Sequence, residues 1–213
     1  MKKKYLISKL CIYAFCSVFY TASAFANIVT LTAEGTVSNV GAGISSDFKT
    51  GDRAVYELIY DTSASNSLGN PAVYKTAISS FRVTVGTYTA TSQSGLINVY
   101  DNFSSMDLFR VTSLTSDGLS GAPVGGHALN RIFFQLWDLD QLWLDSVEIP
   151  TSYLSADDYE NKVFRVDFAD NNILTGDLDT FTVGISQIPI PPAVWLFSSG
   201  LIGLIGMARR MKV

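Results

Sequence analysis

The chain has 213 residues, one histidine, two cysteines and a formal net charge of −4. Cys11 and Cys16 both lie in the first apolar stretch, so the rest of the chain has no thiol for a disulfide, a nucleophile or a metal site. Residues 1–26 and 188–213 contain seven of the fifteen Lys and Arg residues and none of the nineteen acids, which leaves residues 27–187 with a net charge of −11. This acidity argues against nucleic acid and anionic lipid as partners, because phosphate binding needs a basic surface.

The first 26 residues have the three parts of a secretory signal. Residues 2–4 are lysines, residues 10–20 form an uncharged apolar run, and Ala24 and Ala26 provide the small residues of a cleavage site. We therefore expect export through the Sec translocon and cleavage by signal peptidase after Ala26. An uncleaved N-terminal membrane anchor is the alternative, although the apolar run is short for a membrane span.

In residues 27–187, apolar and polar side chains alternate with the period of two that is typical of half-buried β-strands. The runs are short, rich in Val, Thr and aromatic residues, and bounded by Gly, Asn, Asp or Ser. Gly86 and Thr87 separate two runs and predict a hairpin turn. A single helical turn is expected at residues 155–159, with Ser155 as its N-cap. The clearest strands are expected at residues 81–85, 88–91, 109–112, 132–136, 164–168 and 181–185.

About ten short strands without a long helix predict an all-β domain of two packed antiparallel sheets, a β-sandwich or jelly roll. Residues 27–187 are long enough to fold on one hydrophobic core without disulfides. We therefore expect a single domain between the two terminal segments.

The residues that catalysis would need are scarce. His127 is the only histidine and lies in a glycine-rich stretch, where we expect a solvated loop side chain. A serine hydrolase would need this residue as its base, and no Gly-x-Ser-x-Gly nucleophile motif is present. A zinc site would need more ligands than one histidine supplies. We assign no catalytic residue.

Acidic residues gather in the second half of the chain and leave three interpretations open. Asp and Asn are common in turns, which is the simplest interpretation. Oxygen-rich loops also bind Ca²⁺ in extracellular domains, although no EF-hand spacing is present, and paired carboxylates occur in glycosidases. We predict turns and no resident metal or cofactor, with Ca²⁺ as the alternative. The acids concerned are Asp138, Asp140, Asp157, Asp158, Asp170, Asp177 and Asp179.

Trp137 and Trp143 flank a short acidic stretch and are the two tryptophans of residues 27–187. Exposed tryptophans would stack on sugar rings, whereas buried ones would fill the core, which is the commoner use of so large a side chain. A carbohydrate-binding module that uses Trp137 or Trp143 therefore remains an alternative to a purely structural domain.

The end of the chain combines prolines, an apolar run and basic residues. Residues 193–208 carry no charge and would span roughly 24 Å as a helix, slightly less than the usual hydrocarbon thickness of about 30 Å. Trp195 suits the outer interface, while Arg209 and Arg210 suit the cytoplasmic side. We predict one transmembrane helix, and a buried core helix is the alternative. Small residues that would let a second helix approach closely are Gly200, Gly203 and Gly206.

These residues resemble the PEP-CTERM sorting domain. The similarity is greatest to the subgroup whose tail reads V-P-L-P-A-A-V-W-L-F-G-S-G-L-L-G-L-I-G-I-A-R-R. Ile190 occupies the position of the glutamate in the Pro-Glu-Pro motif of the family. The matching positions are Pro189, Pro191, Pro192, Trp195, Gly200, Gly203, Gly206, Arg209 and Arg210.

The resemblance implies recognition by exosortase, a membrane-embedded cysteine protease or transpeptidase, in a bacterium with an outer membrane and an exported polysaccharide matrix. It implies an inner-membrane precursor that is processed near residues 189–192 and then reaches the cell surface or matrix. A permanent single-span anchor is the alternative to processing. The expected organisation is a signal peptide at 1–26, a β-domain at 27–187 and a sorting segment at 188–213.

The β-domain carries a weaker resemblance to the same proteins. Residues 48–61 are similar to their pattern F-x-V-G-D-x-V-x-G-x-F-x-Y-D, with matches at Phe48, Gly51, Asp52, Tyr60 and Asp61. Residues 148–153 are also similar to a stretch of these proteins. The resemblance implies a β-sandwich and carries no active site. We therefore expect a structural or adhesive exported protein rather than an enzyme, with an exopolysaccharide-associated carbohydrate-binding module as the alternative and a hydrolase as the more distant one.

Overall fold

Alternation of apolar and polar side chains produces eleven strands in the computed structural model, which describes residues 26–67 and 69–188. Residues Ala26–Gln187 form one compact unit. The strands are β1 (Ala26–Val40), β2 (Arg53–Asp61), β3 (Ala72–Tyr74), β4 (Ile78–Val85), β5 (Tyr88–Ser92), β6 (Leu96–Tyr100), β7 (Asp107–Leu114), β8 (Ser120–Gly121), β9 (Leu129–Asp138), β10 (Asn161–Phe168) and β11 (Ile173–Ile188).

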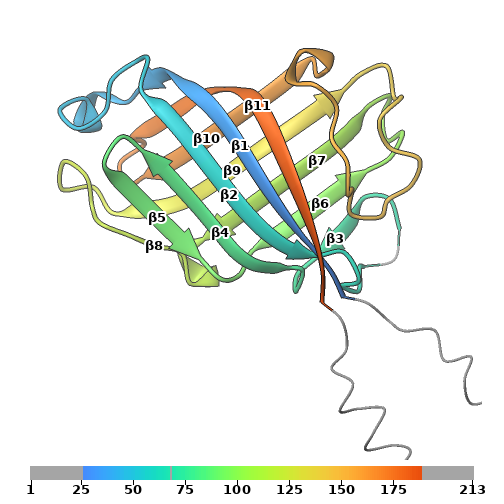
Figure 1. Ribbon diagram of the computed structural model, residues 1–213. Coiled ribbons are helices and arrows are strands. Elements are labelled where there is room, and N and C mark those ends of the chain that lie inside the picture. Colours follow the sequence, from blue (N-terminus) through green and yellow to red (C-terminus); the bar gives the residue numbers. More distant parts are fainter. Residues whose placement is uncertain (1–25, 68, 189–213) are drawn as a thin grey trace, which may run out of the picture. The chain divides into compact units, whose positions relative to one another are not determined.

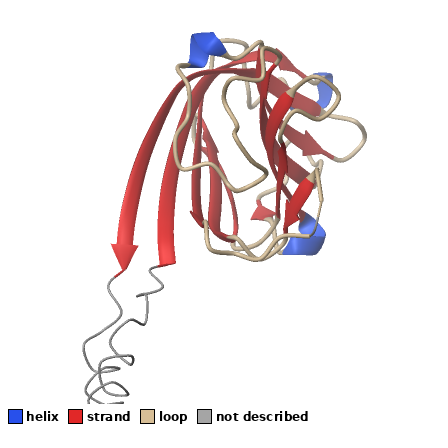
Figure 2. Cartoon of the chain, turned by 90° about the vertical axis from the view of Figure 1, so that its right-hand side faces the viewer, coloured by secondary structure: helices blue, strands red, loops and turns tan. Residues whose placement is uncertain are grey.

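The strands form one sheet in the order β3-β6-β7-β9-β10-β11-β1-β2-β4-β5-β8 (Figure 1). The all-β, antiparallel prediction is confirmed, but a single curled sheet replaces the two separate sheets that we expected. Figure 2 shows the two halves of this sheet facing each other as two walls. The long strands β1 and β11 lie side by side in the middle of the sheet, so the hydrogen-bonded ladder continues from one wall to the other.

Aromatic side chains from both walls meet in the core. Tyr56 on β2 and Phe81 on β4 face Phe134 on β9 and Phe164 on β10, and all four are fully buried. The ring centroids of Tyr56 and Phe164 are 5.4 Å apart, and those of Phe81 and Phe134 are 6.0 Å apart. Burial of such large apolar surfaces is the main force that closes the curled sheet.

The close contact of β1 and β11 depends on glycine. A Cβ atom on Gly35 would lie 2.1 Å from the carbonyl oxygen of Asp177, and one on Gly176 would lie 2.1 Å from the carbonyl oxygen of Thr36. The same added Cβ atom on Gly176 would lie 2.4 Å from Cζ of the Phe164 ring. Neither site has room for a side chain, so these glycines allow the two long strands to pair.

The local turns agree with the sequence. The predicted hairpin joins β4 to β5, with Gly86 at φ +57°. The predicted helical turn is a short 3₁₀ helix, η4 (Ala156–Asp158). Ser155 occupies its N-cap position, but its side chain makes no capping hydrogen bond. Two further 3₁₀ turns are η2 (Ala42–Ile44) and η3 (Thr115–Asp117).

The two edges of the sheet are short. β3 has three residues and β8 has two, so few unpaired backbone groups are available to a further strand.

The two predicted terminal segments fall outside the described residues except at their inner ends, where Ala26 begins β1 and Ile188 ends β11. The undescribed parts are residues 1–25 of the signal peptide, with Ala24, and residues 189–213 of the sorting segment, with all of its predicted motif residues. In residues 26–67 and 69–188, no helix is long and apolar enough to cross a membrane.

The pairing of β1 with β11 generates a prediction. Gly176→Ala should lower the free energy of unfolding by about 2–3 kcal/mol, because the new methyl group overpacks a contact with backbone on one side and an aromatic ring on the other. Urea unfolding of the purified protein measures the change.

Gly184→Ala is the matched control on the same strand, because the nearest atoms to its Cβ position belong to Thr30 at 4.0 Å. We expect its stability to stay within about 0.5 kcal/mol of the wild type. Equal effects of the two substitutions would contradict the close-packing account.

Candidate functional site

The two tryptophans lie on opposite faces of the sheet. Trp143 follows β9 in a loop and packs on the core side, with its ring 4.9 Å from Tyr159 and 6.3 Å from Phe109. Its indole N–H donates to the carbonyl of Ser152 at 3.2 Å. Trp137 lies within β9, next to the fully buried Leu136, and therefore points to the other side of the sheet. Trp143 is thus partly buried against the core, whereas the half-buried Trp137 presents part of its ring on the other face, with its indole nitrogen covered.

Trp137 belongs to a continuous surface that we call the outer face. It is formed by the outward positions of five adjacent strands, and most of its side chains are half-buried by their neighbours. Cross-strand pairing places Trp137 between Leu108 and Asn161, and Phe133 between Thr112 and Arg165. The outer face comprises Leu96, Asn98, Tyr100, Leu108, Arg110, Thr112, Leu114, Arg131, Phe133, Gln135, Trp137, Asn161, Val163, Arg165, Asp167, Ile173, Thr175 and Asp177.

Planar polar groups are fixed between the rings of the outer face. The Arg110 guanidinium donates through Nε and Nη2 to Oε1 of Gln135, at 3.0 and 2.7 Å. The Gln135 amide in turn lies 3.5 Å from Oδ1 of Asn161. Since Gln135 is neutral, the charge of Arg110 has no counter-ion in this chain of contacts.

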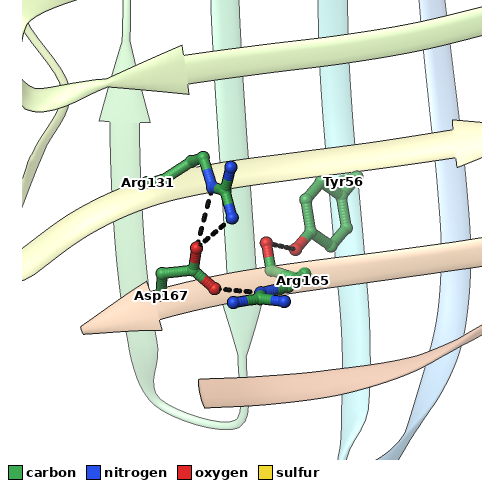
Figure 3. Close-up of polar contacts among 4 residues, drawn as sticks. All are labelled: Tyr56, Arg131, Arg165 and Asp167. Atoms are coloured by element: carbon green, nitrogen blue, oxygen red, sulfur yellow. Dashed lines mark hydrogen bonds and ion pairs between the residues drawn. The ribbon is translucent and has the colours of Figure 1, made fainter. Parts of the chain in front are cut away.

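Two arginines converge on Asp167 at one end of the outer face (Figure 3). Arg131 on β9 donates through Nε to Oδ2 of Asp167 at 2.7 Å, and Arg165 donates through Nε to Oδ1. The Arg131 guanidinium also lies 4.9 Å from the centre of the Phe133 ring, within cation–π range. Asp167 is largely covered, with 13% of its side chain exposed, whereas Arg131 and Arg165 are 35% and 32% exposed.

Tyr56 supports this cluster from the core. Its hydroxyl donates to the carbonyl of Arg165 at 3.3 Å, which links β2 in one wall to β10 in the other. Burial raises the pKa of Tyr56 well above its usual range, and the nearby charge of Asp167 adds to this shift. The phenol therefore remains a neutral hydrogen-bond donor.

A pocket of about 300 Å³ opens beside the arginine pair. Its walls combine apolar, amide and charged side chains, five of which belong to the outer face. The lining residues are Leu114, Asn130, Arg131, Arg165, Asp167, Phe168, Asn171 and Ile173.

A larger pocket, of about 480 Å³, is formed by the loop between β9 and β10. It is lined by residues 143–146 and 148–152 of this loop together with Thr62 and Ser63. Two buried carboxylates hold this loop. Asp138 accepts backbone N–H groups from Leu142 and Trp143 at 3.1 and 2.9 Å, and Asp107 accepts one from Leu144 at 2.9 Å. These carboxylates are structural acceptors of the loop backbone.

The remaining acids have several roles. Asp140 is exposed, and its hydrogen bond to the side chain of Asp138 raises its pKa. Asp170 lies in the turn after β10 with a positive φ, as the turn interpretation predicts, whereas Asp177 and Asp179 lie within β11 instead of in a turn. No group of three or more His, Cys, Asp or Glu residues with the geometry of a metal site occurs in the described part of the chain.

His127 differs from the solvated side chain that we expected. Its Nδ1 lies 2.9 Å from Oδ2 of Asp170, and only 22% of its side chain is exposed. On the other edge of the ring, a Cβ atom on Gly43 would lie 2.6 Å from Nε2. The imidazole therefore lies partly covered between the Asp170 carboxylate and Gly43.

The arginines of the outer face were not singled out from the sequence. In the sequence, Arg110 and Arg165 are the polar residues of two alternating strands, each between apolar neighbours, and nothing else distinguishes them. The spacing of Arg131 and Asp167 along the chain gives no sign of contact, because the pairing of β9 with β10 brings them together.

No protein-family model matches this chain, and no curated protein or solved structure matches it either.

The role of Asp138 can be tested by its removal. Asp138→Ala should lower the free energy of unfolding by about 2–4 kcal/mol, because the substitution leaves backbone N–H groups of the loop without their acceptor. Trp143 should become more exposed, so its fluorescence emission should shift to longer wavelength. Thermal or urea unfolding and an emission spectrum measure both effects.

Asp157→Ala is the control, since the Asp157 side chain is 97% exposed and lies 3.5 Å from Lys162. Its effect should remain within about 0.5 kcal/mol. If Asp138→Ala were as mild, the buried carboxylate would not be what holds the loop.

Proposed function

We propose that this chain is an exported structural or adhesive protein of the cell surface or extracellular matrix, and that its β-domain contacts extracellular polysaccharide. The outer face carries this proposal. Sugar rings present apolar faces and many hydroxyl groups, and the outer face offers aromatic rings beside fixed guanidinium, amide and carboxylate groups. These groups stand on strands, which hold them more firmly than loops would.

The surroundings of His127 favour binding over hydrolysis. In a serine hydrolase, the carboxylate orients one nitrogen of the imidazole while the other nitrogen takes the proton of the nucleophile. In this chain Nδ1 is held by Asp170, but Nε2 lies against the backbone at Gly43. Among the residues that the structure describes, no serine hydroxyl forms a hydrogen bond with this nitrogen, which supports a non-catalytic protein.

The proposed route to the surface depends on residues 188–213. Their resemblance to the PEP-CTERM domain supports membrane insertion by a helix at residues 193–208 and processing by an exosortase-like enzyme. β11 ends at Ile188, immediately before Pro189. Prolines 189, 191 and 192 fix φ and lack backbone donors, which favours an extended segment that a membrane protease would engage.

Polysaccharide binding should depend on Trp137. We expect the purified protein to retain matrix polysaccharide on a glycan array or in affinity electrophoresis, and Trp137→Ala to weaken binding by roughly tenfold through loss of stacking area. Ile185→Ala removes an exposed apolar side chain outside the outer face and should leave binding unchanged. Equal losses in both variants would indicate non-specific adhesion, and hydrolysis of the glycan would contradict a binding role.

Sorting can be tested by mass spectrometry of the mature protein from its native host. We expect an N-terminal peptide that begins at Asn27 and a C-terminal peptide that ends near residue 190. Replacing Arg209 and Arg210 by Gln should reduce processing, because these residues are expected to hold the segment in the membrane. Recovery of intact residues 207–213 on surface-localised protein would instead establish a permanent anchor.

A further inference from the structure

We propose that the pocket beside Arg131, Arg165 and Asp167 binds the carboxylate of a uronic-acid unit, so that the ligand of the outer face is an acidic polysaccharide. This inference rests on the proposed polysaccharide contact and names the chemical class of its ligand.

The distribution of charge supports an anionic ligand. Residues 27–187 carry a net charge of −11, yet two of the arginines of the outer face, Arg131 and Arg165, meet at the pocket around the single carboxylate of Asp167. The pocket end of the outer face is therefore locally positive within a strongly acidic domain. Asp167 is shared by two guanidinium groups, which leaves one positive charge uncompensated at the pocket.

The arginines also have donors to spare. Arg165 contacts Asp167 through Nε, and its two terminal nitrogens have no hydrogen-bond partner among the residues that the structure describes. Arg131 uses Nε and Nη2 on one carboxylate oxygen, which leaves Nη1. A planar guanidinium that is already oriented by one carboxylate can accept a second one with little loss of side-chain entropy.

The size and lining of the pocket fit a sugar ring. Its volume of about 300 Å³ is at the lower end of the range for small-molecule sites. The side-chain amides of Asn130 and Asn171 can donate to and accept from hydroxyl groups, while Leu114 and Ile173 offer apolar contact.

A glycan fits this place better than an extended peptide. Peptides that pair with a sheet need a free edge, and the edges here, β3 and β8, have three and two residues. The pocket lies on the face of the sheet along β9, β10 and the start of β11, where all backbone partners are other strands of the sheet. Recognition at this position must therefore come from side chains.

The test compares one polymer in two charge states. The full-length protein in a non-ionic detergent is applied to immobilised polygalacturonate and to the same polymer with its carboxylates methyl-esterified. We expect binding to polygalacturonate that is at least about tenfold tighter than to the ester. Arg165→Gln should remove most of this preference, and it leaves the pair of Arg131 with Asp167 to hold the fold.

Two variants control for folding and for charge. Arg165→Lys keeps the positive charge but lacks the planar fork, so part of the preference should remain. Arg82→Gln removes the same charge from the other wall, where Arg82 pairs with Glu57 at 3.6 Å and is 53% exposed. It should bind as the wild type does, and the thermal midpoints of all variants should be compared.

The outcomes separate this inference from the proposed function. Equal binding to both forms of the polymer, or binding to neutral matrix glycans alone, would overturn the carboxylate site and leave polysaccharide contact standing. Binding to no glycan would overturn both. Equal loss of binding in Arg165→Gln and Arg82→Gln would show that the general charge of the protein is recognised instead. Equally tight binding to polyglutamate would show that an acidic peptide is recognised as well as a glycan. Either result would also overturn the inference.

Discussion

The pairing of β1 with β11 is the constraint on which the rest of the structure depends. These long strands join the two walls of the sheet, and Gly35 and Gly176 allow their backbones to approach where no side chain fits. Because the ladder is continuous through this pair, the walls curl over one core instead of packing as separate sheets. The aromatic contacts between Tyr56 and Phe164 then close the interior, and the opposite surfaces of β7, β9 and β10 are left to form the outer face.

Two kinds of buried or half-buried carboxylate serve different purposes in this fold. Asp107 and Asp138 face each other across β7 and β9 and accept backbone N–H groups, so their charge is used inside the protein to hold loops. Asp167 accepts instead from two arginines whose remaining donors are free to act at the surface. The first arrangement stabilises a loop, and the second orients cations, which is why we assign a binding role only to the second.

The alternation of apolar and polar residues predicted the individual strands and turns well. The alternation around Phe81, Phe134 and Phe164 correctly indicated buried strand faces, and Gly86 correctly marked a hairpin. Strand order was not accessible in this way, because it depends on which long-range contacts form, and the joining role of β1 and β11 has no local signal. The dependence on long-range contacts also explains why the arrangement of the candidate site was not predicted from the sequence. Trp137 and Trp143 are close in sequence, but strand parity and a loop place them on opposite faces.

The geometry of the outer face also bears on how tightly it would bind. One pocket of about 300 Å³ provides few enclosed contacts, so a single domain would bind a glycan weakly. A polysaccharide repeats its units, and a surface protein is present in many copies, so weak sites would act together through their high effective concentration. The combined binding of many copies is strong, while each single site binds and releases its sugar unit quickly. That behaviour suits adhesion to a matrix better than capture of a free sugar, and it requires no catalytic group on the protein.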